Sequence, residues 1–406
     1  SSRSAPVAKR VDQFNRCLER MARRGLDELH LVGFFGYHKI LSAVEGSTPA
    51  MSRYSDACWL NSSVITTLCD SQINVSTTSL SYRIGVEDVG AVCELVSMSK
   101  WIETLRLSTA LDCTQACRHT VMSALLGSQL SFSLATLDLG SFGDIGFKNA
   151  CEILRWTQCK RCVLTQLDLT NTFKLERPDD VAILLDACRG TTCPVLKDLR
   201  LNNCLNKVEG AEYDETEPFP DQAVFTLPSV VLRAGWPLQA LDLSQQPDYM
   251  LCDITVRTIV DAMRSQHTNS VLGCQLRSLG LCEGMIEDQG AVLLANTIKE
   301  PWCKLETLWM SYNSIGDEGI VAFAGAVCSP GNTLHVLHLY GSDMEMSEAG
   351  GSAMLAAILD EVDGTSRRNE CQLTELALPD YGDDMLELAD VLSETMEDVG
   401  ISYWVE

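Results

Sequence analysis

The sequence predicts an α/β solenoid, in which similar strand, turn and helix units stack side by side. A short leucine-spaced segment occurs ten times, and its copies start about 29 residues apart, or farther apart where the chain carries insertions. A helix-spaced apolar stripe follows the clearest copy. Because each unit of a solenoid contacts only its neighbours, 406 residues can form one elongated domain without one large core.

The clearest unit reads LETLWMSYNSIGDEGIVAFAGAV and begins at Leu305. We expect Leu305, Leu308 and Met310 to point inward from a short strand. We expect Asn313 to hydrogen-bond the backbone where the chain turns away from that strand. The apolar residues that follow have the spacing of one helix face and should cover the same core: Ile320, Phe323, Ala324 and Val327.

The same opening recurs along most of the chain. Its copies begin at Leu26, Ile102, Leu134, Leu164, Leu196, Leu238, Leu276, Leu305, Leu334 and Leu373. The 76 residues that separate the first two starts leave room for a degenerate unit. The segment from Val75 to Leu80, followed by Ile84, is the candidate for it.

A unit of 28 to 29 residues with a full helix resembles the ribonuclease-inhibitor type of leucine-rich repeat, over roughly residues 26 to 405. The resemblance implies a curved horseshoe of about 10–11 repeats, with parallel strands on the concave side and helices on the convex side. That family includes inhibitors, sensor domains, ubiquitin-ligase adaptors and one group of GTPase activators. It therefore implies binding without specifying what is bound.

The repeats divide the chain into a solenoid over 26–382 and two terminal segments. Residues 1–25 predict a basic capping helix, although part of an organelle-targeting segment would look similar. Residues 383–406 predict a closing helix and strand, because the last unit of a solenoid must cover its core. The acidic insertion at 206–233 predicts either a solvated loop or an arm that binds a basic partner.

Charge and cysteine content exclude several classes of protein. A net charge of −24 disfavours direct nucleic-acid binding, and no apolar stretch approaches the length that membrane insertion requires. The repeat places most of the 18 cysteines among small buried residues, which favours a reducing intracellular compartment. We expect the cytoplasm, with an organelle matrix as the alternative.

Residue patterns typical of catalysis are missing from the sequence: it has no phosphate-binding glycine loop, no His-Glu-x-x-His and no nucleophile elbow. A zinc site formed by Cys159, Cys162, Cys188 and Cys193 is the weaker interpretation of those thiols, because metal-ligand pairs normally come at tighter matched spacing. The sequence predicts no enzyme, no cofactor, no metal and no small-molecule substrate.

The candidate binding residues lie at outward-facing places of the repeat. Counted from the first leucine, the third, fifth and seventh places of each unit point away from the core. The outward row is charged in the earlier units, with Arg106, Asp138, Asp168, Arg200 and Asp242, and aromatic later, with Trp309, Tyr312, His338 and Tyr340 on adjacent strands. Exposed aromatic residues on rigid strands are typical binding hot spots. The alternatives are that another segment of the chain covers the rings, and that the Asp and Arg residues only neutralise each other.

The sequence favours a non-enzymatic scaffold or accessory subunit of a larger assembly, which binds a protein partner through the concave face. A basic partner is the sharper form of this prediction, given the acidic charge. The alternative is a GTPase activator of the leucine-rich repeat type. The resemblance to that group implies an acidic tail and a functional loop arginine, but the sequence given ends in ISYWVE and Arg106 is predicted in a strand.

Overall fold

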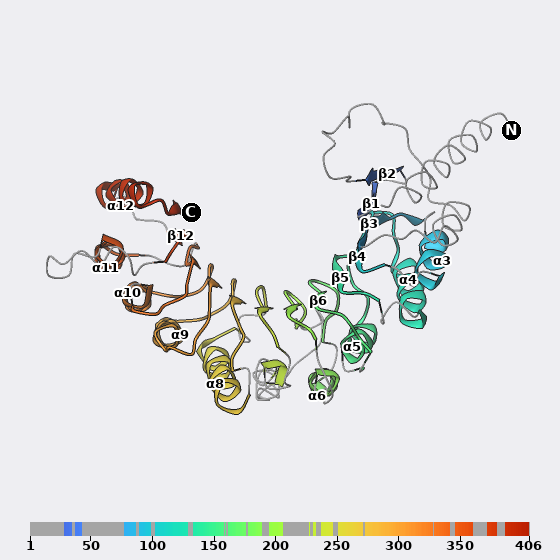
Figure 1. Cartoon of the computed structure of the whole chain (residues 1–406), viewed down its shortest axis with the longest axis horizontal. Helices are drawn as coiled ribbons and strands as arrows, with labels where there is room; N and C mark the ends of the chain where they lie inside the picture. Colours follow the sequence, from blue (N-terminus) through green and yellow to red (C-terminus); the bar gives the residue numbers. More distant parts are fainter. Residues whose placement is uncertain are drawn as a thin grey trace. The chain divides into compact units, whose positions relative to one another are not determined.

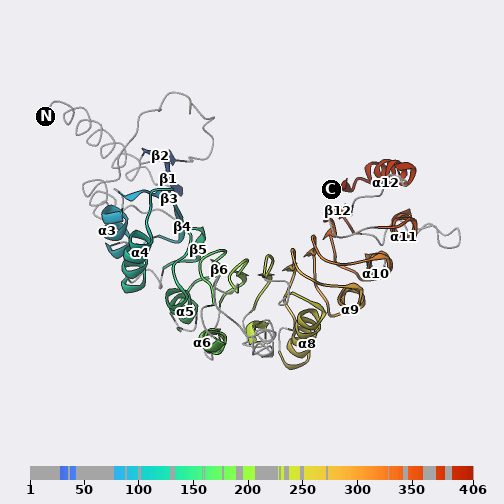
Figure 2. The same ribbon diagram turned by 180° about the vertical axis from the view of Figure 1, so that it is seen from behind.

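Strands and helices alternate in the computed structural model of this chain (Figures 1 and 2). It describes residues 28–34, 37–42, 77–86, 89–98, 102–128, 133–157, 159, 161–175, 178–188, 195–205, 227, 230–232, 237–246, 251–270, 273–327, 329–341, 346–359, 372–379 and 386–405. The chain forms two compact units, Ser1–Lys174 and Leu175–Glu406. We call them the first unit and the second unit.

The first unit contains a six-stranded sheet with the strand order β2-β1-β3-β4-β5-β6. Its strands are β1 (Glu28–Phe34), β2 (Tyr37–Ser42), β3 (Thr77–Ile84), β4 (Thr104–Thr109), β5 (Thr136–Ser141) and β6 (Gln166–Asp168). Its helices are α3 (Val89–Met98), α4 (Gln115–Gly127) and α5 (Phe147–Trp156), all on one side of the sheet (Figure 1). Every strand pair in this sheet is parallel except β1 with β2.

Two features of the first unit bear on the sequence predictions. The degenerate repeat predicted between the copies at Leu26 and Ile102 is present, because β3 lies between β1 and β4 and is followed by α3. Strand β2 is an exception to the predicted parallel strands, because it pairs antiparallel with β1. Two residues separate these strands, and so short a connection joins antiparallel neighbours because a parallel crossover needs a dozen or more residues.

The second unit has seven parallel strands in the order β7 to β13. They are β7 (Asp198–Arg200), β8 (Ala240–Asp242), β9 (Ser278–Gly280), β10 (Thr307–Trp309), β11 (Val336–His338), β12 (Glu375–Leu378) and β13 (Ser402–Val405). The helices are α6 (Pro178–Cys188), α8 (Asp253–Asn269), α9 (Asp288–Ile298), α10 (Asp317–Val327), α11 (Glu348–Leu359) and α12 (Leu386–Val399). Helices α8 to α11 lie side by side on one side of the strands (Figure 2).

The repeated leucines form the core, as the sequence predicted. Leu279, Leu308 and Leu337 are paired across β9, β10 and β11, and each is fully buried. Burial of one such side chain stabilises the fold by about 1.5–3 kcal/mol. The predicted helix stripe is buried on α10, at Ile320, Phe323, Ala324 and Val327. The chain is an α/β leucine-rich repeat solenoid.

The predicted turn residue Asn313 is also buried and bonded as expected. Its Nδ2 donates to the carbonyls of Leu281 and Met310 at 2.9 and 2.8 Å, and its Oδ1 accepts from the N–H of Ile286 at 3.1 Å. These backbone groups belong to two successive repeats. The Asn313 side chain therefore joins the turn of its own repeat to the turn of the preceding repeat.

Carboxylates join the helices of the second unit in a similar way. Asp253 at the start of α8 accepts from two N–H groups at the start of α9. Asp288 at the start of α9 accepts from the N–H groups of Gly316 and Gly319 at 2.7 and 2.9 Å, where α10 begins. Asp317 accepts from Ser347 before α11. Each carboxylate caps the following helix and complements its positive end.

Several predicted segments lie outside the described residues, including the capping helix at 1–25 and most of the insertion at 206–233. Near the end of that insertion, Leu227, Val231 and Leu232 are buried, so this part is not a solvated loop. The predicted closing elements correspond to α12 and β13, and β13 pairs with β12. No helix among the described residues has the length and apolarity required to cross a membrane.

Candidate functional site

The sheet face opposite the helices carries the predicted binding residues. We call it the strand face. It presents the third and fifth residues of each repeat, counted from the first leucine. On β10, for example, Thr307 and Trp309 are partly exposed while Leu308 between them is buried. We consider the charged row (Arg106, Asp138 and Asp168 in the first unit; Arg200 and Asp242 in the second) separately from the aromatic patch (Trp309, Tyr312, His338 and Tyr340).

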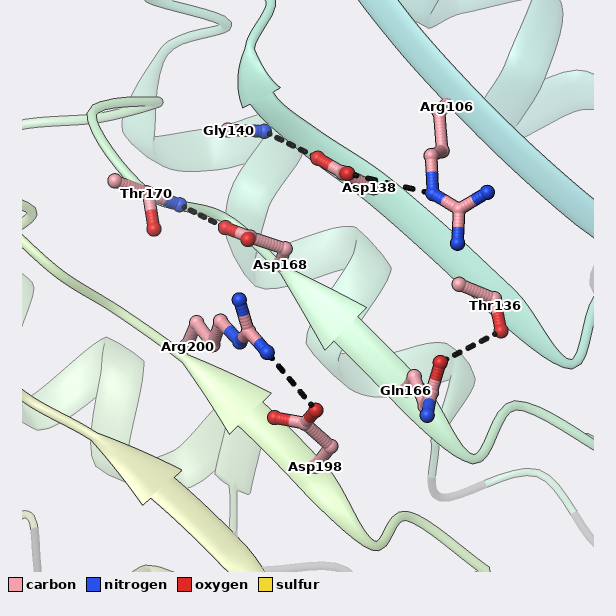
Figure 3. Close-up of polar contacts among 9 residues, drawn as sticks. All are labelled: Arg106, Thr136, Asp138, Gly140, Gln166, Asp168, Thr170, Asp198 and Arg200. Carbon is pink, nitrogen blue, oxygen red and sulfur yellow. Dashed lines mark hydrogen bonds and ion pairs between the residues drawn. The ribbon is translucent and has the colours of Figure 1, made fainter. Parts of the chain in front are cut away.

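Arg106 and Asp138 form an ion pair between adjacent strands of the first unit. Their N and O atoms are 3.8 Å apart, and the side chains are 47% and 37% exposed. Figure 3 shows the pair at the strand face. At such exposure a salt bridge contributes about 0–1 kcal/mol. The two opposite charges of this pair offset each other at the surface.

The aspartates of the charged row share a backbone role. Oδ1 of Asp138 accepts from the N–H of Gly140 at 3.1 Å, and Oδ1 of Asp168 accepts from Thr170 at 2.9 Å (Figure 3). Asp242 in the second unit accepts from Ser244 at 3.1 Å. In each case the carboxylate of the fifth residue of the repeat accepts from the N–H of the seventh, as in an Asx turn. These carboxylates therefore support the end of the strand.

The remaining members of the charged row belong to the second unit. Arg200 pairs with Asp198 of its own strand, at 3.5 Å (Figure 3). Asp242 also accepts from Nδ2 of Asn202 at 2.9 Å. The next strand has Gly280 at the fifth place, because a Cβ there would lie 2.3 Å from Oδ1 of Asp242. The absence of a side chain at Gly280 thus leaves room for the Asp242 carboxylate of the adjacent strand.

The aromatic patch spans two neighbouring repeats. Trp309 and His338 are paired residues of β10 and β11. The Tyr312 and Tyr340 ring centroids are 5.4 Å apart at an interplanar angle of 75°, and the His338 ring is 6.0 Å from that of Tyr340. Edge-to-face contacts of this kind orient the rings. Tyr312 remains 39% exposed, so a binding partner could contact it.

The prediction that all four members lie on strands needs one correction. Tyr312 and Tyr340 follow β10 and β11, whose last residues are Trp309 and His338. Tyr312 has a positive φ of 58°, which turns the chain away from the sheet. A Cβ at Gly341 would lie 2.6 Å from the backbone nitrogen of Tyr312, so only glycine leaves room for the tyrosine on this side.

Glu375 is a member of the site that the sequence analysis missed. Its Oε1 lies 2.7 Å from Nε2 of His338, whose side chain is only 13% exposed. Glu375 occupies the third, outward place of the repeat that begins at Leu373. Listing the outward third places as well as the fifth would have identified it.

Seven of the cysteines that the structure describes are buried. Burial raises the pKa of the Cys303 thiol to about 11 and also raises the pKa of Cys274 and Cys162. In the part of the chain that the structure describes, no group of three or more His, Cys, Asp or Glu residues is placed to hold a metal ion. Of the four cysteines considered as zinc ligands in the weaker interpretation, Cys193 lies outside the described residues and Cys159 is exposed.

No protein-family model matches this chain, and no curated protein matches it in sequence. Among solved structures, 70 chains match. One of them is an internalin (inlF) from Listeria monocytogenes, at 13% sequence identity and a TM-score of 0.31, and the match covers 83% of this chain and 86% of that chain. The fold assignment rests on the strands, helices and pairings described above.

Proposed function

We propose that this chain is a non-enzymatic interaction scaffold or accessory subunit that binds a protein partner through the aromatic patch. The observation that carries the proposal is the cluster of Trp309, Tyr312, His338 and Tyr340 on the strand face of two adjacent repeats. Tyrosine and tryptophan held by rigid backbone bury much area on binding and lose little conformational entropy.

The charged row contributes less in this proposal. Its aspartates already bind backbone N–H groups, and both arginines already have carboxylate partners. Exposed charges at the rim of an interface mainly change the association rate and its salt dependence. We therefore assign the affinity for a partner to the aromatic patch and expect the row to affect the association rate at most.

The direct test is capture of partners from native extract, with the wild-type chain compared with the Trp309→Ala, Tyr340→Ala double variant. Each substitution should weaken binding by about 2 kcal/mol if these residues are hot spots. Val321→Ala is the matched control, because Val321 is an exposed apolar residue on α10, on the helix side of the same repeat. Identical sets of bound proteins for all three chains would contradict the proposal.

Two further measurements separate this proposal from its alternatives. Acceleration of GTP hydrolysis by substoichiometric amounts of the chain would favour a GTPase activator instead. A large fall in melting temperature of the double variant would show that Trp309 and Tyr340 serve the fold. The many buried thiols fit a reducing compartment, cytoplasmic or within an organelle, and labelling of free thiols in the native protein tests that part.

A further inference from the structure

Tyr312 occupies a place that other repeats give to polar residues. Asn171, Asn203, Gln245 and Glu283 hold the same eighth place, and each has a positive φ between 52° and 59°. A bulky side chain is disfavoured in this left-handed backbone, whereas asparagine tolerates it well. Tyrosine is therefore retained here against the conformational preference of the site, which points to a role for its ring outside the fold.

The sequence around the aromatic patch is strongly acidic. The second unit carries 13 Lys and Arg against 39 Asp and Glu, a net charge of −26, whereas the first unit has 18 against 16, a net charge of +2. Residues 305–406 alone have two basic and 20 acidic residues. The unit that contains the patch thus carries the net negative charge of the chain and would attract a cationic partner.

The repeats before and after those of Tyr312 and Tyr340 each carry a glutamate: Glu283 and Glu375. Glu375 belongs to the strand that follows His338 and is bonded to its ring. Glu283 holds the eighth place of the preceding repeat, where its Oε1 accepts from Nε2 of Gln245 at 2.7 Å. The chain passes directly beside Tyr312 there, because the N–H of the next residue, Gly284, donates to the Tyr312 carbonyl at 3.1 Å.

We propose that the aromatic patch recognises an arginine-bearing basic segment of its protein partner, with a guanidinium stacked on the face of the exposed Tyr312 ring, which the Tyr340 ring contacts edge to face. This inference rests on the proposed function and specifies its partner. Ring faces attract cations, and arginine stacks on them while its N–H groups pair with carboxylates. Glu283 and Glu375 supply carboxylates on the preceding and following repeats. A nucleic acid would be repelled by the same surface.

The probe is a fluorescein-labelled peptide with four arginines separated by glycines, and fluorescence anisotropy measures its binding. Matched peptides carry lysine or glutamate in place of arginine. The wild-type chain should bind the arginine peptide at least threefold more tightly than the lysine peptide and should not bind the glutamate peptide. Equal affinity for the arginine and lysine peptides would overturn the assignment, because attraction by net charge alone does not distinguish them.

Variants then locate the binding site. Tyr312→Leu with Tyr340→Leu should weaken binding of the arginine peptide about tenfold, whereas Tyr312→Phe with Tyr340→Phe keeps the ring faces and should stay within twofold of wild type. Glu375→Gln should weaken binding several-fold. Glu318→Gln removes the same charge from the exposed side of α10 and should have no such effect. Equal losses for Glu375→Gln and Glu318→Gln would reduce the effect to net charge and overturn the proposal.

Tyr312→Asn should change stability and peptide binding in opposite directions. It replaces tyrosine by the residue that the chain itself uses at Asn171 and Asn203, so the melting temperature should rise. Binding of the arginine peptide should fall about fivefold. A lower melting temperature with unchanged binding would show that Tyr312 serves the fold and would refute its assignment to a ligand.

The peptide assay and the partner capture distinguish failure of the arginine proposal from failure of the scaffold proposal. If the Trp309→Ala, Tyr340→Ala variant loses a native partner while the arginine peptide does not bind, the scaffold proposal stands and arginine recognition is wrong. If the variant keeps its partners and the leucine variants keep the peptide, both proposals fail.

Discussion

The two compact units close the same turn with different side chains. In the first unit the ninth place of the repeat is apolar at Ala110 and Phe142 and is a threonine at Thr172, and all three residues are buried. In the second unit Gln246 and Asn313 hold this place and bond the backbone of two repeats. An apolar residue fills the turn by packing alone, whereas an amide satisfies the polar groups that the turn leaves unpaired.

The difference continues at the strands and the helix ends. Strands β3 to β5 of the first unit have six to eight residues, whereas β6 of that unit and β7 to β11 of the second have three. In the second unit Asp253, Asp288 and Asp317 join successive helices, and at the start of α4 in the first unit Arg118 donates to the carbonyl of Asp144 instead. In the second unit, side-chain bonds to carboxylates thus supplement the short strand pairings between repeats.

The largest expected effect is on the apolar turn of the first unit. Phe142→Ala should lower the free energy of unfolding by about 3–5 kcal/mol, because the fully buried ring leaves a cavity under β5. Chemical denaturation measures the loss. Phe142→Leu should recover most of it. A loss below 1 kcal/mol for Phe142→Ala would mean that the ring does not fill this turn.

The corresponding change in the second unit acts on polar groups. Asn313→Ala should cost about 2–4 kcal/mol, because it leaves the N–H of Ile286 and the carbonyls of Leu281 and Met310 without this partner. Thr172 holds the same place in the first unit, and its hydroxyl donates to the carbonyl of Leu169. Thr172→Val should therefore cost only about 1 kcal/mol. Equal losses at the two places would remove this contrast between the units.

The buried thiols predict a loss of stability in alkaline solution. Burial raises the pKa of Cys303 from 9.0 to about 11, so the unfolded thiol ionises first as the pH rises. The contribution is fully present below pH 9 and is lost by about pH 11, a loss of about 2–3 kcal/mol. Cys303→Ala should reduce the decline in unfolding free energy between these pH values. An unchanged slope would show that the Cys303 thiol does not titrate in this way.

The smallest effect concerns the carboxylates that join the helices. Asp288→Ala should cost about 1 kcal/mol, because two N–H groups at the start of α10 lose their acceptor. Asp288→Asn keeps an acceptor oxygen and should cost less, and the difference between the two variants should shrink at high salt. Glu318→Ala on the exposed side of α10 is the control. A loss for Asp288→Ala no larger than that of the control would show that the cap adds no stability.

The outward placement of Trp309 and His338 follows from the sequence more directly than the backbone contacts of the charged row do. Trp309 and His338 fall at outward places because strand side chains alternate, and a single repeat is enough to establish that. The backbone role of Asp138, Asp168 and Asp242 depends on which N–H groups the neighbouring strand leaves unpaired. Composition and spacing do not contain that information, so the row resembled a binding surface.

The sequence by itself determined the repeated unit, its inward leucines and the buried turn at Asn313, because these depend on residues a few positions apart and on the burial of apolar surface. Only the tertiary structure decided which residues of successive repeats meet. His338 bonds Glu375 37 residues later, and Asp242 fills the space beside Gly280. Insertions of different lengths separate the repeats. Such contacts are therefore fixed by the alignment of neighbouring strands and not by a constant spacing along the chain.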